Sequence, residues 1–347
     1  MNNRVLSLDV LRAMAILSVL ALHSLDFMSG IPPVLTSIFS FGWIGVDLFF
    51  VLSGFLIGLQ AFQQNNVVNI KNSIKKFLIK RWFRTLPLYY FVLIFYVLIK
   101  PRLGFPFTAE PIQFIFLIQN FFSPKDFVQS WSLCIEEQFY LLFPLVYFGF
   151  KLKKVKKFYW LLPGFISMCY RFWLYKNGVS SHTPADSSYN YRFPFITHLD
   201  GISWGVFLAS TFNTWSKYKN KRYILGLGCI FLLLSLSYIG SDNLNSKVIL
   251  SFQLLSLSFS LILVGIYDLQ YIPLRKVFEI VALWSYGLYL WNNVMVKIVS
   301  KVGAGHGNIS KMLIFIFLSC FASALTYYFI EKPSLKWRDH FIRKQGL

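Results

Sequence analysis

The sequence has few cysteines and few acidic residues for its length. Its 347 residues include 4 cysteines, none in a CxxC spacing or beside a histidine pair, so we expect buried thiols and neither a metal site nor a disulfide framework. Acidic residues number 14 against 34 Lys and Arg. In a soluble protein that excess would suggest a nucleic-acid partner. The sequence shows no soluble module at either end, so we expect no nucleic-acid partner here. No cleavage-like site follows the first apolar stretch, which is too long and too polar for a signal peptide.

Apolar residues dominate the composition. The hydrophobic fraction is 56%, Phe alone contributes 38 residues, and the mean hydropathy is +0.55, which predicts an all-α, polytopic membrane bundle. We expect a single membrane domain over residues 1–347 without an additional soluble domain. The ten candidate spans are roughly residues 9–28, 41–62, 86–100, 130–150, 158–176, 193–212, 222–240, 247–267, 279–300 and 309–331. The apolar segment 112–122 is too short to cross and is expected at the outer interface or as a re-entrant piece.

Basic residues are distributed unequally between the two sets of loops. With the N-terminus inside, 24 Lys and Arg fall on the inner side and 8 on the outer side. By the positive-inside rule, both termini should be cytoplasmic and the protein should lie in the plasma membrane. The expected chemistry then takes place within the bundle.

The first span carries four ionisable residues on one helix face. Asp9 and Arg12 lie near its start, and His23 and Asp26 near its end; at about 1.5 Å per residue, His23 lies roughly 16 Å from Arg12. Ionisable groups in membrane helices indicate function by default. Alternatively, Asp9 and Arg12 only mark the interface and His23 is a hydrogen-bonded packing residue.

The second span, GWIGVDLFFVLSGFLIG, adds Asp47 and the pair Gly54 and Gly58. The glycines predict close approach of another helix. An unpaired carboxylate would be strongly penalised in the bilayer, so Asp47 should have a cationic partner. The expected partners are His23, Arg171 and Lys297.

Two further segments place charges at opposite ends of the bundle. Lys80, Arg81 and Arg84 lie at the start of the third span, where the arginine pair shares a face suited to phosphate oxygens; the alternative is ordinary attraction to anionic lipid. Glu136 and Glu137 enter the fourth span. Such a pair can orient an imidazole, or Glu137 can cap a helix end or bind Arg171.

Several polar residues are expected at a similar depth. The set comprises His23, Asp47, Glu136, Asp200 and Asn292. Together these residues suggest a polar cavity within the bundle.

Taken in order, these segments resemble the pattern of the membrane acyltransferase family 3. The resemblance covers residues 6–333 and rests on Arg12 and His23, GWIGVDLFFVLSGFLIG, the RWFR pair, SWSLCIEEQFY, HLDG at 198–201, SYGLYLWN from Ser285 and FIEKP. Each piece is weak alone, whereas the ordered set is specific. Members of this family are multi-pass proteins that use cytosolic acyl-CoA to acylate hydroxyl groups, often on surface polysaccharides or their lipid-linked precursors.

The resemblance also assigns expected roles. His23 matches the family's essential histidine, Arg12 a motif arginine, Arg81 and Arg84 the donor-associated RxxR, and Glu136 the motif acid. The family often has Arg at position 198 and His at position 292, where this sequence has His198 and Asn292, so neither inherits a role. Many relatives carry an extra esterase-like domain outside the membrane; here we expect transfer to be completed by the bundle or with a separate partner.

The expected function is therefore O-acetyl transfer from acetyl-CoA to a glycan hydroxyl. His23, with Asp47 or Glu136, would act as base or as acyl relay, and Arg12, Lys80, Arg81 and Arg84 would bind the donor; no metal is expected. The competing class is a transporter or flippase for a glycan or a lipid-linked sugar, which would also contain a polar cavity. The acceptor, the choice between acetyl and succinyl, and the oligomeric state are left open by the sequence.

Overall fold

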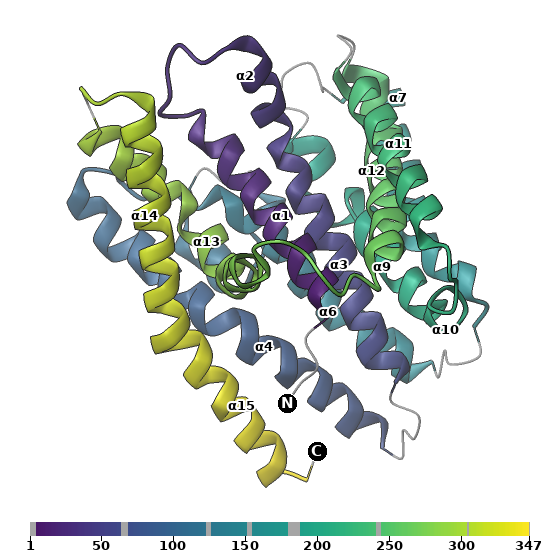
Figure 1. Ribbon diagram of the computed structural model, residues 1–347. Helices are drawn as coiled ribbons and strands as arrows, with labels where there is room; N and C mark the ends of the chain where they lie inside the picture. Colours follow the sequence, from purple (N-terminus) through teal and green to yellow (C-terminus); the bar gives the residue numbers. More distant parts are fainter. Residues whose placement is uncertain are drawn as a thin grey trace. The chain divides into compact units, whose positions relative to one another are not determined.

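The computed structural model describes residues 5–63, 69–122, 126–150, 155–179, 188–240, 244–303 and 305–346. These residues form helices, turns and loops without a β-strand (Figure 1), which confirms the expected all-α class. The α-helices of eight or more residues are α1 (Leu6–Ser24), α2 (Pro33–Ser40), α3 (Ile44–Phe62), α4 (Ile70–Ile94), α6 (Trp131–Gly149), α7 (Leu162–Lys176), α9 (Asp200–Ser210), α11 (Lys221–Gly240), α12 (Leu244–Ile266), α13 (Arg275–Val302), α14 (Asn308–Thr326) and α15 (Lys332–Lys344). The short α5 (Pro111–Ile115) and α10 (Phe212–Trp215) lie between them.

Six helical stretches are long and apolar enough to cross a membrane. Within the described parts of the chain they cover residues 6–24, 33–62, 70–102, 221–240, 247–266 and 308–344. The other four expected spans correspond to α6, α7, α9 and α13. Helices α7 and α9 have only 15 and 11 residues, while α6 and α13 carry several polar side chains. The expected interfacial segment 112–122 forms only α5 and a 3-10 turn.

The chain divides into two compact units, which we call the first and second unit. The first comprises Met1–Ala15, Ile44–Asn66 and Leu152–Glu279, and the second comprises Ile16–Trp43, Val67–Lys151 and Ile280–Leu347. Helix α1 contributes residues to both. Some of the Lys residues expected on the cytoplasmic side, within positions 151–154, lie outside the described residues.

In the first unit, α3 and α9 pack backbone against backbone. A Cβ added at Gly54 of α3 would overlap the Ile202 carbonyl of α9, and one added at Gly205 would overlap the Val51 carbonyl. A Cβ at Gly58 would likewise meet the Ala209 side chain. The small residues thus let the two helices approach closely, as small-xxx-small patterns do in membranes. This confirms the expectation for Gly54 and Gly58.

Helices α11 and α12 form an adjacent hairpin in the same unit, visible side by side in Figure 1. Glycine again sets the separation, because a Cβ at Gly228 would crowd the backbone of Ile262 and one at Gly265 would crowd Leu225. Near the start of α11, the Lys221 ammonium donates a hydrogen bond to Asp268 beyond the end of α12. This ion pair joins the two ends of the hairpin.

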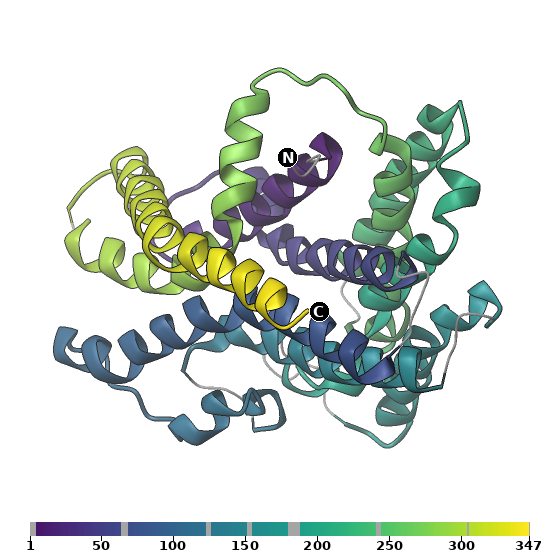
Figure 2. The same ribbon diagram turned by 90° about the horizontal axis from the view of Figure 1, so that it is seen from below.

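In the second unit, α14 continues through a π turn (Tyr327–Glu331) into α15, which packs on α4. Both views show α15 beside α4 (Figures 1 and 2). The Ser334 hydroxyl donates to the Phe83 carbonyl at 2.6 Å, and the rings of Phe83 and Phe341 stack with centroids 6.1 Å apart. Helix α4 begins at an Asn69 cap whose side chain accepts from the Asn72 amide.

Asp126 organises the segment that leads into α6. Its carboxylate accepts hydrogen bonds from the Lys100 ammonium at 2.9 Å, from the Thr108 amide and hydroxyl at 2.7 and 2.9 Å, and from the Ala109 amide at 3.1 Å. Burial raises the pKa of the Asp126 carboxyl, but these hydrogen bonds and the Lys100 charge outweigh burial and hold the pKa below its usual value. The loop before α6 is therefore fixed by one ionised side chain.

Candidate functional site

Helix α1 carries two of the expected site residues on one uninterrupted helix. Arg12 is partly buried and lies 3.8 Å from the buried Asp9 carboxylate. His23 is in the last turn, with 26% of its side chain exposed and Nδ1 3.6 Å from the Asp26 carboxylate. The His23 imidazole is therefore accessible and has a carboxylate beside one ring nitrogen. That arrangement suits a group that must exchange a proton with a substrate.

The second unit brings together two groups expected to act on the donor and in catalysis. The Arg81 guanidinium on α4 lies between the Phe77 and Tyr140 rings, at 5.9 and 5.7 Å from their centroids. It also interacts electrostatically with Arg84, Glu136 and Glu137. Helices α4 and α6 thus place the RWFR arginines and the carboxylate pair of SWSLCIEEQFY in one cluster. The expectation that these charges lie at opposite ends of the bundle is therefore wrong.

Glu137 is the buried member of the carboxylate pair. Its Oε1 accepts a hydrogen bond from the Thr85 hydroxyl, and the Tyr286 hydroxyl donates to the Thr85 carbonyl at 2.8 Å. Its Oε2 has no hydrogen-bond partner among the described residues. Glu137 does not bind Arg171, so that expectation is wrong. The half-buried Glu136 stays accessible while Glu137 anchors α6 to α4.

Residues of FIEKP and SYGLYLWN join the same neighbourhood. Glu331 is 9% exposed and interacts electrostatically with Arg84, and Tyr286 comes from α13. Both motifs contribute to the family resemblance, but the sequence alone assigned no role to Glu331 or Tyr286. Their burial beside charged partners in the folded unit is what distinguishes them.

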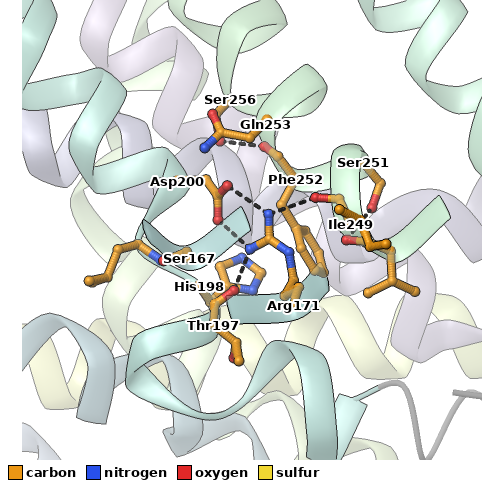
Figure 3. Close-up of polar contacts among 12 residues, drawn as sticks. Ser167, Arg171, Thr197, His198, Asp200, Ile249, Ser251, Phe252, Gln253 and Ser256 are labelled. Atoms are coloured by element: carbon orange, nitrogen blue, oxygen red, sulfur yellow. Dashed lines mark hydrogen bonds and ion pairs between the residues drawn. The ribbon is translucent and has the colours of Figure 1, made fainter. Parts of the chain in front are cut away.

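The first unit contains a separate buried ion pair, shown in Figure 3. The two terminal guanidinium nitrogens of Arg171 donate to the Asp200 carboxylate, at 2.7 and 2.9 Å. Arg171 also donates to the carbonyls of Thr197 and Ile249, and its guanidinium lies 5.1 Å from the Phe252 ring centroid. Arg171 and Asp200 are both 0% exposed. This pair joins α7, α9 and α12 and leaves Arg171 engaged with protein groups.

Asp47 has partners other than those expected from the sequence. Its Oδ1 lies 2.8 Å from His198 Nε2, and its Oδ2 accepts from Arg192 at 3.4 Å. The expected partners His23, Arg171 and Lys297 were therefore wrong. The His198 ring is 0% exposed and packs against Phe50 and Phe252. A carboxylate held by two partners at this depth has little freedom to orient a third group.

The remaining candidates lie in the second unit. Lys80, one of the expected donor-binding residues, is half-buried on α4 near Arg338 and Asp339 of α15. Asn292 is completely buried on α13, and its carboxamide has no hydrogen-bond partner within the described ranges. Asp200 and Asp47 belong to the first unit, whereas His23, Glu136 and Asn292 belong to the second. The polar cavity expected to join all five stays a prediction.

Comparison with known proteins provides an independent assignment. The acyltransferase domain family (acyltransferase family 3) matches residues 5–330. O-acetyltransferase OatA of Staphylococcus aureus strain NCTC 8325 / PS 47 is 28% identical over 369 residues, covering 98% of this chain and 57% of the relative. OatA of strain COL matches with the same values.

A further S. aureus protein, from strain MRSA252 and named as a candidate O-acetyltransferase, is 28% identical over 382 residues, covering 96% of this chain and 59% of the relative. The chain thus spans less than two thirds of the length of these relatives. No solved structure matches it. The family match and the apolar helices together show that the chain is a multi-pass membrane protein belonging to the acyltransferase family 3.

Proposed function

We propose that this chain is a membrane O-acetyltransferase that moves an acetyl group from cytosolic acetyl-CoA to a hydroxyl of a cell-surface polysaccharide or its lipid-linked precursor. Family membership and relatives named O-acetyltransferase support acyl transfer to oxygen. The observation that carries the proposal is the cluster of the second unit, in which Arg81 interacts electrostatically with both Arg84 and Glu136. Two guanidinium groups at i, i+3 suit the phosphate groups of a phosphorylated thioester donor.

The proposed topology has ten spans with both termini in the cytoplasm. Positive charge at the start of α4 supports it, because Lys75, Lys76, Lys80, Arg81 and Arg84 would then face the compartment that contains acetyl-CoA. Arg12 is close to the start of α1 and would lie on the same side, near the entry of the pantetheine arm. His23, at the other end of the helix, would face an acceptor that enters from outside.

The reacting group is His23. In direct transfer, its neutral imidazole accepts the proton of the acceptor hydroxyl as that oxygen attacks the thioester carbonyl. The carbon–sulfur bond breaks, and the CoA thiolate leaves and takes up a proton. In the relay version, an imidazole nitrogen attacks the thioester first, the carbon–sulfur bond breaks, and the CoA thiolate leaves and takes up the imidazole proton. The acetyl-imidazole then passes its acetyl group to the acceptor oxygen, and the hydroxyl proton returns to the imidazole.

Glu136 is the better candidate to stabilise the imidazolium. Asp47 was the other candidate, but His198 and Arg192 already engage both of its carboxylate oxygens. Glu136 is half-buried and lies in the same unit as His23. Asp26 also approaches His23 Nδ1 at 3.6 Å, so its carboxylate can hold the ring tautomer.

The test is release of free CoA thiol by purified protein supplied with acetyl-CoA and candidate glycans. The wild-type protein should release thiol in an acceptor-dependent manner, and His23→Ala should lose at least about 100-fold of the rate, the usual contribution of general-base catalysis. The exposed His306, outside the site, provides His306→Ala as the matched control. A wild-type protein that moves a glycan across proteoliposomes without releasing CoA would instead be a transporter.

A further inference from the structure

Helix α15 is a basic helix packed on another basic helix. Its sequence KPSLKWRDHFIRK contains five Lys and Arg and one acidic residue, Asp339. It packs on α4 at Phe83, next to the basic segment IKNSIKKFLIKRW. Like charges on packed helices repel one another. Two such helices are therefore expected to accommodate a polyanion where their charges converge.

The contact between the helices defines which charges converge. Ser334, Arg338 and Phe341 fall within about 60° of one another around α15, at about 100° per residue. Ser334 and Phe341 both contact Phe83 of α4, so this stripe faces α4. Lys336 and Arg343 lie on the opposite side of α15 and are exposed.

Lys80 of α4 lies at the centre of the charged surface. It interacts electrostatically with three cations, Lys76, Arg81 and Arg338, and with one anion, Asp339. Asp339 is already bound by Arg338, whose Nε and NH2 both lie 2.8 Å from Asp339 Oδ1. The positive charges therefore outnumber the negative one, and Arg81 extends the surface toward Arg84.

We propose that Arg338 of α15, together with Lys80 of α4, binds phosphate groups at the nucleotide end of the acyl-CoA donor. This inference rests on the proposed function and extends the donor site from α4 alone to both helices. Coenzyme A carries a pyrophosphate and a 3′-phosphate, and such a ligand needs several cations spread over a surface. Guanidinium groups bind phosphate oxygens through paired hydrogen bonds, and Arg338 must exchange Asp339 for phosphate when the donor binds.

The experiment measures CoA affinity for the full chain in nanodiscs of neutral phosphatidylcholine. Arg338→Gln should weaken binding by about 5- to 20-fold, as expected for loss of one charge-assisted contact. Asp339→Asn removes the competing carboxylate and should strengthen binding by about 2- to 5-fold. Lys336→Gln removes one positive charge from the opposite side of the same helix and should change affinity less than about twofold. Opposite signs at neighbouring positions cannot come from misfolding.

The other outcomes separate the possible errors. If the wild-type protein binds no CoA, the proposed donor is wrong and this inference fails with it. If it binds CoA but Arg338→Gln behaves like Lys336→Gln, the proposed function stands and the role of α15 is wrong. If Arg338→Gln instead removes a stabilisation seen only when anionic phospholipid is added to the nanodiscs, the phosphate bound by α15 is a lipid headgroup, which also overturns the assignment to CoA.

Discussion

Removing the charge of Arg171 should destabilise the first unit more than removing both members of its ion pair. Arg171→Leu leaves Asp200 without its cationic partner at 0% exposure and removes the donors to the Thr197 and Ile249 carbonyls. Loss of one partner of a buried pair costs about 3–5 kcal/mol. For a chain of 347 residues, that should lower the apparent melting temperature by roughly 4–7 °C.

The double variant Arg171→Leu/Asp200→Leu relieves the uncompensated charge. It still leaves two carbonyls without their donor, at about 1–3 kcal/mol each. Arg171→Leu bears the same cost in addition to the unpaired Asp200, so the double variant should melt between the wild type and Arg171→Leu. Lys176→Ala, at the exposed end of the same helix, should change the melting temperature by no more than about 1 °C. The measurement is thermal unfolding of detergent-purified protein. A double variant less stable than Arg171→Leu would refute the account of this pair.

Three further changes test other parts of the structure. Gly205→Val would force a side chain into the Val51 carbonyl of α3 and should cost about 1–3 kcal/mol or more of the free energy of unfolding. The control is Gly226→Ala, whose Cβ would meet nothing within 4 Å; it should be neutral or slightly stabilising in the same unfolding assay. The pKa of Asp126 is lowered in the folded protein from an unfolded value of 3.8. The ionised carboxylate therefore stabilises the fold above pH 3.8, and this stabilisation disappears as pH falls through the lower folded pKa. Asp126→Asn should reduce the free energy of unfolding at pH 7, and the two proteins should become equally stable as pH falls below about 3.8. In the thiol-release assay, Arg81→Gln should raise KM for acetyl-CoA about tenfold or more, while an unchanged KM would remove it from the donor site.

The helical class and the close approach at Gly54 could be predicted because they depend on local composition and spacing. The first helix was expected over residues 9–28 and is observed over Leu6–Ser24. The RWFR arginines and the carboxylate pair of α6 were expected at opposite ends of the bundle, yet Arg81 interacts electrostatically with Glu136 and Glu137. The partner of Asp47 could not be predicted. His198 lies 151 residues away, and nothing in local periodicity relates two such distant positions.

The sixth expected span shows a second limit. It was expected over residues 193–212, but the helix begins only at Asp200 and the preceding residues form a short 3-10 turn after Pro194. Hydropathy identified an apolar stretch, whereas the helix start depends on backbone geometry near Pro194 and on the buried contacts of Thr197 and His198. The pairing of Arg171 with Asp200 likewise depends on tertiary packing. Hydropathy could not predict it, because it treats Asp200 and Glu137 as equivalent carboxylates.

The central claim is that His23 transfers an acetyl group to a surface glycan. Mass spectrometry of glycans from cells producing the wild-type protein, His23→Ala or His306→Ala tests it most directly, because it identifies the acyl group and the acceptor together. The account predicts acetyl esters on glycan hydroxyls with the wild type and with His306→Ala, and their loss with His23→Ala at equal protein abundance. Acetylation that persists unchanged in the His23→Ala cells would contradict it.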